Sequence, residues 1–330
     1  MGQVRRGEAG TDQTTEDIIC TCFKKAEAVL HVAGCVCLMD NAGLLHNAHV
    51  VATANVVRCA RLAGVKALVF TSSGGAVTSP LLREPQLRVP CDLVLPDDFP
   101  FASHYSRTKY APAENSLFSC HSSCIHLRQG LLARIRYAAE RLALSANSKG
   151  FGVCALRLPG LYGLGDSLIV DPLLSGRLTH VPCGGQECLI DFCYVENAAH
   201  AHCVALDALL GSPSSSRRVA GRAFNVTNGE AETAPVVPMW NQLLRICRPE
   251  ARPLQPLPYL VAYLVACATE AIDWFTAGRV PCPRAAVWSL TRASLGFATT
   301  AVTLQLSNDL GYRHRPIRFW LALPLSLPPP

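Results

Sequence analysis

Two short apolar runs on either side of a helix-like stretch constrain the fold of this chain more than any other feature. The first run covers residues 26–33 (AEAVLHVA) and the second covers residues 65–71 (VKALVFT), and both suit strands that are buried on two faces. Between them, residues 47–62 carry apolar side chains at mostly three- and four-residue steps, which predicts a helix. A strand, a helix and a second strand in this order predict a βαβ unit, so we expect an α/β fold with a parallel sheet.

The second part of the chain continues this alternation. Residues 131–146 predict a helix and residues 152–158 (GVCALRL) a further buried strand, with a short strand near residues 224–227. The segment between residues 79 and 100 is rich in Pro and Asp and predicts a loop, and a helix is expected near residues 103–110.

The composition excludes several classes of protein. Half of the 330 residues are hydrophobic and 16% are charged, which excludes a disordered, collagen-like or coiled-coil chain. The net charge of +6 comes from arginines scattered along the chain, so we expect no nucleic-acid partner. The polar N-terminal residues 1–18 contain no signal peptide, so we expect a protein that is not secreted and cysteines that are mostly reduced.

A cluster of possible metal ligands lies at Cys120-His121-x-x-Cys124-x-His126. Its spacing is tighter than that of ordinary zinc sites, in which paired ligands are set further apart along the chain. We therefore expect no metal ion in this protein.

The residue types that point to chemistry are two serines, a tyrosine and a lysine. Ser72 and Ser73 directly follow the second apolar run, at the end of the predicted strand, where an open α/β sheet binds ligands. Tyr105 and Lys109 follow, four residues apart, and so share one face of a helix. An ammonium group near a phenol favours the phenolate, which can exchange a proton with a carbinol or carbonyl oxygen.

Several motifs together resemble the extended short-chain dehydrogenases/reductases. These motifs are LHVAG, residues 53–56 of the predicted helix, VFTSS, HYSRTK, residues 190–202 and the apolar segment LPYLVAYLVACATEAIDWF. Within this superfamily they are similar to the 3β-hydroxysteroid dehydrogenase-like group, closest to family 42E. The resemblance implies a Rossmann-type parallel sheet followed by a smaller C-terminal substrate region.

The resemblance also implies an activity and its catalytic residues. Tyr105 would be the acid/base, Lys109 would lower its pKa, and Ser73, or Ser72 as the alternative, would orient the substrate oxygen. The implied reaction moves a hydride between NAD or NADP and a secondary alcohol or ketone of a small apolar substrate, such as a steroid.

The cofactor residues implied by the resemblance surround the same sheet edge. His31, Ala33 and Pro159 would flank the cofactor, and Tyr105 and Lys109 would contact its nicotinamide ribose. Pro159 lies one place later than the proline of the family pattern.

Two features depart from the family pattern. None of the 23 glycines supplies the glycine-rich turn that holds the pyrophosphate, so we expect a sheet without its N-terminal glycine-rich strand, turn and helix. The A-E-x-x-(V/L)-L pattern, which the family places directly after the lysine, appears only at residues 138–144. The alternative function is therefore a catalytically dead or truncated family member that acts as a membrane-associated binding protein.

These observations divide the chain into regions. We expect a disordered or non-family segment at 1–25, a truncated Rossmann-type domain at 26–230 with an irregular insertion at about 110–136, a substrate region at 231–317 and a disordered tail at 318–330. The apolar stretch 254–275 predicts a buried or interfacial helix, because its uncharged part is too short to span a bilayer. We expect a location in the cytoplasm or on an intracellular membrane such as the endoplasmic reticulum.

Overall fold

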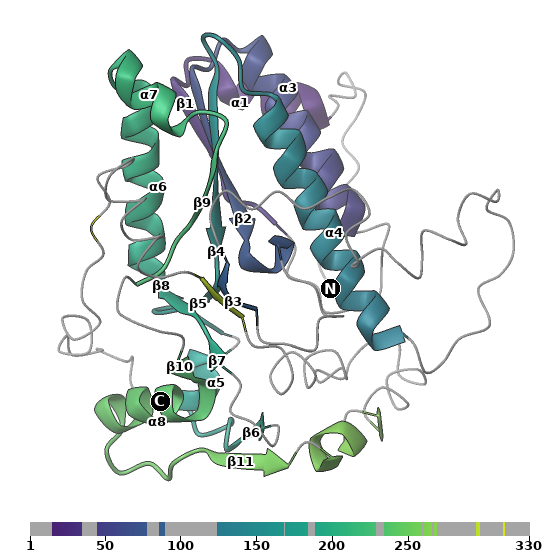
Figure 1. Cartoon of the computed structure of the whole chain (residues 1–330), viewed down its shortest axis with the longest axis vertical. Coiled ribbons are helices and arrows are strands. Elements are labelled where there is room, and N and C mark those ends of the chain that lie inside the picture. The colour runs from purple at the N-terminus through teal and green to yellow at the C-terminus, as the bar shows by residue number, and fades with distance from the viewer. Residues whose placement is uncertain are drawn as a thin grey trace, which may run out of the picture.

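The computed structural model contains an α/β unit and, below it in Figure 1, a smaller region made of short strands and helices. It describes residues 15–34, 45–77, 86–89, 124–167, 169–183, 189–228, 234–258, 260–265, 267–268, 295–297 and 313. The predicted helix near residues 103–110 and the predicted tail at 318–330 lie outside these ranges.

A four-stranded parallel sheet forms the centre of the α/β unit. Its strands lie in the order β1 (Ala28–His31), β2 (Ala67–Ser73), β4 (Gly152–Leu158) and β9 (Ala223–Asn225). The strands pair in parallel throughout, with His31 opposite Phe70 and Ser73 opposite Leu158. The predicted α/β fold and parallel sheet are therefore confirmed. Strands that are apolar on both faces need helices above and below them.

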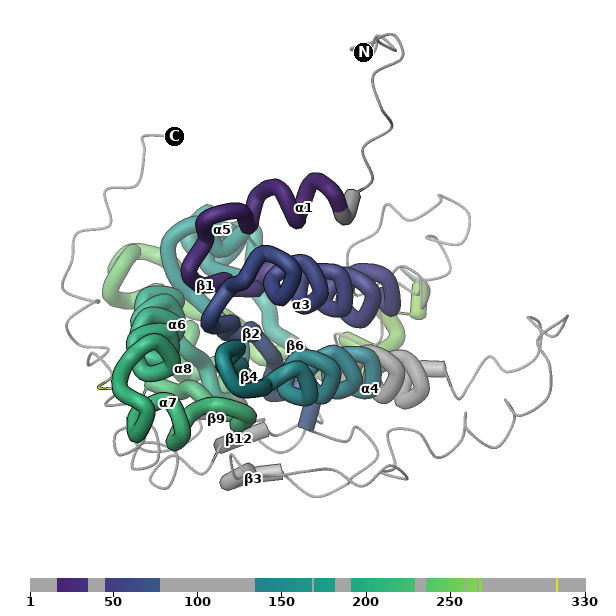
Figure 2. Tube along the Cα trace, turned by 90° about the horizontal axis from the view of Figure 1, so that it is seen from above, coloured from purple at the N-terminus to yellow at the C-terminus, as the bar shows by residue number. Residues whose placement is uncertain are grey.

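Helices cover both faces of this sheet (Figures 1 and 2). One face carries α1 (Thr15–Phe23), α3 (Ala52–Leu62) and α4 (Cys124–Ser145), and a π-helical turn at Asn47–Val51 leads into α3. The other face carries α6 (Val195–Leu210), followed by α7 (Pro213–Val219). Each face of the sheet therefore has its own buried apolar cluster, one against α3 and α4 and one against α6.

The smaller region is built from short elements around a third apolar cluster. At its centre, Trp240 on α8 (Val236–Cys247) packs edge-on against Tyr162 and Phe192. A 3₁₀ turn at Gly74–Val77 directly follows β2 of the central sheet.

The other short elements are β3 (Gln86–Val89), β5 (Gly160–Tyr162), α5 (Val170–Leu174), β6 (His180–Cys183), β7 (Leu189–Ile190), β8 (Phe192–Tyr194), β10 (Ala234–Pro235), β11 (Gln255–Pro258) and β12 (Leu295–Phe297). The strands among them form one four-stranded and two two-stranded sheets.

Three expected boundaries differ from the structure. Helix α1 lies inside the segment expected to be disordered, because Phe23 at its end packs on the apolar cluster beneath α3. Helix α4 begins at Cys124, inside the expected insertion, where Leu127, Arg128 and Gln129 favour a helix. Strand β11 occupies the start of the expected helix at 254–275, where two prolines prevent an α-helix, and helical residues follow at 260–265 and 267–268. No helix within the described residues is long and apolar enough to cross a membrane.

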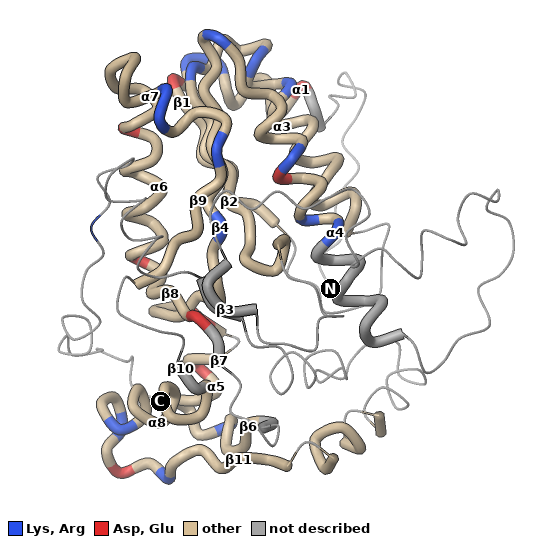
Figure 3. The backbone as a smooth tube through the Cα atoms, in the orientation of Figure 1, with Lys and Arg blue, Asp and Glu red and all other residues tan. Residues whose placement is uncertain are grey.

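Basic residues gather at the end of the α/β unit where the parallel strands begin (Figure 3). This end holds Lys24, Lys25, Arg61, Lys66, Lys149, Arg217, Arg218 and Arg222, which lie near strand starts or helix ends. Cations are favoured at helix C-termini by the helix dipole, which accounts for this charge without a ligand. The opposite edge of the sheet, where the strands end, carries the candidate site.

Candidate active site

Three of the site residues predicted from the sequence lie at the C-terminal edge of the main sheet. Ser73 is the last residue of β2, Pro159 directly follows β4, and His31 is the last residue of β1. These strands are neighbours and parallel, so the three residues lie at one edge. Tyr105 and Lys109 lie outside the described residues.

Ser72 and Ser73 have different surroundings, although they are adjacent on β2. The Ser72 side chain is buried and its hydroxyl donates a hydrogen bond to Glu140 Oε2 over 2.5 Å. Ser73 is half-buried, and its Oγ accepts a hydrogen bond from the Gly75 amide over 3.2 Å. Ser72 is therefore engaged inside the protein, whereas Ser73 faces the edge of the sheet.

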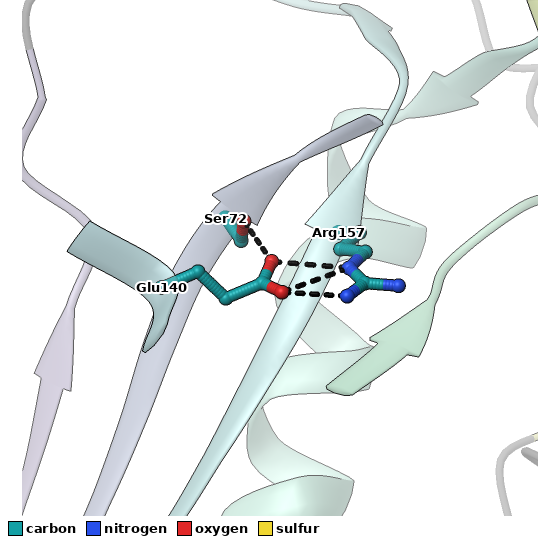
Figure 4. A network of polar contacts seen from close by, with 3 residues as sticks. All are labelled: Ser72, Glu140 and Arg157. Carbon is teal, nitrogen blue, oxygen red and sulfur yellow. Dashed lines mark hydrogen bonds and ion pairs between the residues drawn. The ribbon is translucent and has the colours of Figure 1, made fainter. Parts of the chain in front are cut away.

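A buried ion pair fixes β2, β4 and helix α4 relative to one another (Figure 4). Arg157 on β4 donates from Nη2 to Glu140 Oε1 over 2.6 Å, and its Nε lies 3.1 Å and 3.0 Å from the two carboxylate oxygens. The side chains of Arg157 and Glu140 are 3% and 1% exposed. Together with Ser72, they link β4, α4 and β2 at the end of the sheet.

One turn before Glu140 on the same helix, Arg136 reaches Ser73. Its Nη1 donates a hydrogen bond to Ser73 Oγ over 3.3 Å, and its side chain is half-buried. The guanidinium and the serine hydroxyl meet directly above Gly75, where a Cβ would lie 3.6 Å from Nη1 and 3.5 Å from Oγ. This place in the fold thus combines a hydroxyl, a guanidinium and a glycine.

His31 lies at the end of β1 in a buried position. Its Nε2 forms a hydrogen bond with Thr53 Oγ1 of α3 over 3.0 Å, and its ring packs against that of Phe70. Burial lowers the pKa of His31, and the neighbouring His49 lowers it further. His31 is thus held as a neutral ring, whereas Ala33, two residues further on, is exposed.

The other face of β2 carries a second histidine contact. His202 of α6 donates from Nδ1 to the Ala198 carbonyl over 2.7 Å, which leaves Nε2 to accept a hydrogen bond from the Thr71 hydroxyl, also over 2.7 Å. Burial lowers the pKa of His202, against the opposing effect of the Ala198 carbonyl. The His202 ring thereby joins α6 to β2.

The sequence predictions assigned no role to Arg136, Glu140 or Arg157. The sequence does indicate a buried ion pair, because a lone arginine inside the apolar strand GVCALRL needs a buried carboxylate partner. Glu140 is the helical carboxylate that meets this requirement. Arg136 had no comparable signal, since an arginine on a helix is usually a surface residue. Among the described residues, no group of three possible ligands could hold a metal ion, and Cys120 to His126 lies mostly outside them.

The fold and the site define a Rossmann-type α/β protein with its ligand edge at the C-terminal ends of parallel strands. Residues 4–126 and 121–248 match the model of the 3-beta hydroxysteroid dehydrogenase/isomerase family. These two segments cover more than half of the chain, so the chain belongs to this family. The match begins at residue 4 and includes α1 and β1. The narrower assignment to family 42E stays a prediction.

Individual relatives agree with the family match. The sterol-4-alpha-carboxylate 3-dehydrogenase (decarboxylating) of Schizosaccharomyces pombe is 30% identical over 230 residues, which cover 68% of this chain and 56% of the relative. The enzyme of that name from Mus musculus is 27% identical over 257 residues, which cover 74% of this chain and 58% of the relative. The chain therefore spans little more than half the length of these relatives.

A solved structure supports the fold. The structure of MoeE5 in complex with UDP-glucose and NAD superposes with a TM-score of 0.56 at 18% sequence identity. The superposition covers 93% of this chain and 80% of MoeE5. At this identity the likeness establishes the Rossmann-type fold.

Proposed function

We propose that this chain is the catalytic part of an NAD(P)-dependent oxidoreductase that acts on the 3-hydroxyl of a sterol or steroid. The observation that carries the proposal is Ser73, a half-buried hydroxyl at the end of the central strand, beside Arg136. Family membership and relatives that are sterol-4-alpha-carboxylate 3-dehydrogenases support the same substrate class.

The chain's own residues divide the work of this reaction. The Ser73 hydroxyl donates a hydrogen bond to the substrate oxygen, and the Tyr105 phenolate accepts the proton of the carbinol. The Lys109 ammonium favours that phenolate, and Lys109 and Tyr105 contact the nicotinamide ribose. NAD or NADP would supply the hydride acceptor for this oxidation.

The described residues fit one half of such a cofactor. His31, Ala33 and Pro159 follow the ends of three neighbouring strands, the place at which a Rossmann-type sheet binds a dinucleotide. The described residues before β1 contain no glycine-rich turn that could hold the pyrophosphate, because residues 15–27 contain no glycine. We therefore assign these residues to the nicotinamide end, and the missing glycine-rich turn stays a prediction.

Calorimetric titration with NAD⁺ and NADPH tests the cofactor part of this proposal, after circular dichroism has shown that the chain is folded. Binding that weakens in Tyr105→Phe and Lys109→Ala but not in Arg134→Gln supports the proposal, since Arg134 is exposed on α4. Oxidation of a 3β-hydroxysterol, followed by NADH absorbance, tests the reaction itself. A folded chain that binds neither cofactor at millimolar concentration contradicts the proposal.

The alternative is a binding protein without turnover that contacts an intracellular membrane such as the endoplasmic reticulum. The supporting observation is the helical stretch at residues 260–265, where four large apolar side chains are exposed. They are Leu260 (65%), Val261 (46%), Leu264 (59%) and Val265 (49%). Co-sedimentation with phosphatidylcholine vesicles that weakens in Leu264→Asp, but not in the exposed Leu210→Asp on α6, would favour this function. Turnover of a sterol would exclude it.

A further inference from the structure

We infer that Arg136 is a positioning residue for the reaction. Together with the Gly75 amide it occupies the acceptor positions of Ser73 Oγ, so that the Ser73 hydroxyl is left to donate its hydrogen to the substrate oxygen. The inference rests on the proposed function and deepens it, because it states what fixes the direction of that hydrogen bond. It is carried by two hydrogen bonds that converge on one oxygen atom.

Both partners of Ser73 Oγ are N–H donors. The Gly75 amide donates over 3.2 Å and Arg136 Nη1 over 3.3 Å. A serine hydroxyl has two acceptor lone pairs and one donor hydrogen, so these two donors take up its acceptor capacity. Within the part of the chain that the structure describes, no acceptor binds the hydrogen of this hydroxyl.

The neighbouring Ser72 has the opposite arrangement. Its hydroxyl donates to Glu140 Oε2, so its hydrogen is engaged inside the protein. Turning this hydroxyl toward a substrate would take a hydrogen bond away from a buried carboxylate, which costs free energy. The described contacts therefore leave Ser73, of these two serines, as the donor at the end of β2.

The direction of the Ser73 hydrogen bond matters to the reaction. A ketone oxygen accepts hydrogen bonds and cannot donate one, whereas a carbinol has a hydrogen to give up. A hydroxyl that donates therefore binds the ketone oxygen, and it leaves the carbinol hydrogen to the phenolate of Tyr105. The charge of Arg136 adds to this effect, because a hydroxyl that accepts hydrogen bonds becomes a stronger donor.

Buried contacts set the position of Arg136. Glu140 lies one turn after Arg136 on α4 and binds Arg157 of β4 and Ser72 of β2. The Gly75 amide belongs to the turn that directly follows β2, so it fixes the Ser73 side chain from the end of its own strand. Both donors are thus in place before a substrate binds, and preorganised donors are the ones that assist a reaction most.

Infrared difference spectroscopy of a bound ketone reads this hydrogen bond without turnover. The probe is a 3-oxosteroid with a heavy carbon isotope at its ketone, bound to the full chain together with NAD⁺, a pair between which no hydride can pass. A hydrogen bond to the ketone oxygen lowers the C=O stretching frequency. We therefore expect the frequency to rise in Ser73→Ala and to rise by a smaller amount in Arg136→Met.

Steady-state oxidation of a 3β-hydroxysteroid shows whether Arg136 acts through Ser73. Arg136→Met should lower kcat about 10-fold, less than Ser73→Ala does, because the hydroxyl and the Gly75 amide remain. In a chain that already carries Ser73→Ala, the same change should lower kcat by at most about twofold, because no hydroxyl is left to orient. Arg136→Lys keeps an N–H donor and the charge and should restore most of the activity. The control Arg134→Met, exposed on the same helix, should change neither kcat nor the C=O frequency.

Three results would overturn the inference while the proposed function stands. The first is a loss in Arg136→Met that is equally large with and without Ser73, and the second is an unchanged C=O frequency in Arg136→Met. The third is a shift in the pH profile of kcat/KM that persists in the Ser73→Ala background, which would assign Arg136 to the acid/base Tyr105. If Arg136→Met does not fold, Arg136→Gln serves in the same experiments, because its amide ends short of the guanidinium nitrogen. A folded unaltered chain that neither oxidises the steroid nor binds the 3-oxosteroid overturns the proposed function and the inference with it.

Discussion

Glu140 and Arg157 form an ion pair that is almost completely buried between helix α4 and strand β4, with side-chain exposures of 1% and 3%. Their contact is bidentate, and Ser72 supplies a further donor to the same carboxylate. Removing two charged groups from water costs free energy, and their attraction offsets this cost only when their remaining polar atoms also form hydrogen bonds. The pair thereby fixes the helix that carries Arg136 against the strand that carries Ser73.

Replacement of one partner of this pair should strongly destabilise the protein. Glu140→Gln leaves the Arg157 charge buried without its counter-charge, and we expect a loss of about 3–5 kcal/mol in the free energy of unfolding. Urea unfolding followed by circular dichroism measures this loss. The matched control is Glu27→Gln, which breaks the exposed pair with Lys66 and should cost much less.

The double variant Glu140→Met with Arg157→Leu separates the burial of charge from the loss of packing. Apolar residues of similar volume need no counter-charge, so the double variant should recover most of the stability lost in Glu140→Gln. A double variant that is as unstable as the single one would contradict this account of the pair.

The two serines at the end of β2 should differ in what their replacement changes. Ser72→Ala removes a donor to a buried carboxylate and should cost about 1–3 kcal/mol of stability, with a smaller effect on turnover. Ser73→Ala should leave stability nearly unchanged and lower kcat by about 10² to 10³, as loss of a donor to the reacting oxygen does. Steady-state kinetics beside urea unfolding measures both effects, and the opposite pattern would assign the substrate contact to Ser72.

The central sheet and its helices α3 and α4 could be predicted from the sequence because their apolar periodicity is a local signal. The strand at residues 152–158 and the strand that ends in Ser72 and Ser73 are confirmed within two residues. The partner of Ser73 could not be predicted in this way. Arg136 is far from Ser73 along the chain, and its contact arises only when α4 packs against the sheet. Tertiary contacts of this kind leave no periodic trace in one sequence.

Trp240 should be the residue whose replacement most weakens the smaller region. Its side chain is 2% exposed and contacts the rings of Tyr162 and Phe192 edge-on. Trp240→Ala leaves a large cavity in the third apolar cluster, for which we expect a loss of about 3–5 kcal/mol. Thermal unfolding followed by circular dichroism measures it. The control Ile246→Ala on the same helix removes a side chain that is 40% exposed and should change stability by at most about 1 kcal/mol.

The two buried histidines should make the protein less stable in mild acid. Burial lowers the pKa of His31 and of His202 in the folded state, so the unfolded chain, with histidines near their usual pKa of about 6.5, binds protons more readily. The free energy of unfolding should therefore be constant above about pH 7.5 and should fall as the pH drops through about 6.5, by at most about 1.4 kcal/mol per pH unit for each histidine.

Urea unfolding between about pH 5 and pH 8 measures this slope of the free energy of unfolding against pH. His202→Gln keeps a donor and an acceptor for Ala198 and Thr71 but cannot titrate, so it should reduce the slope. A slope that is the same in His202→Gln as in the unaltered chain would mean that another group takes up the proton.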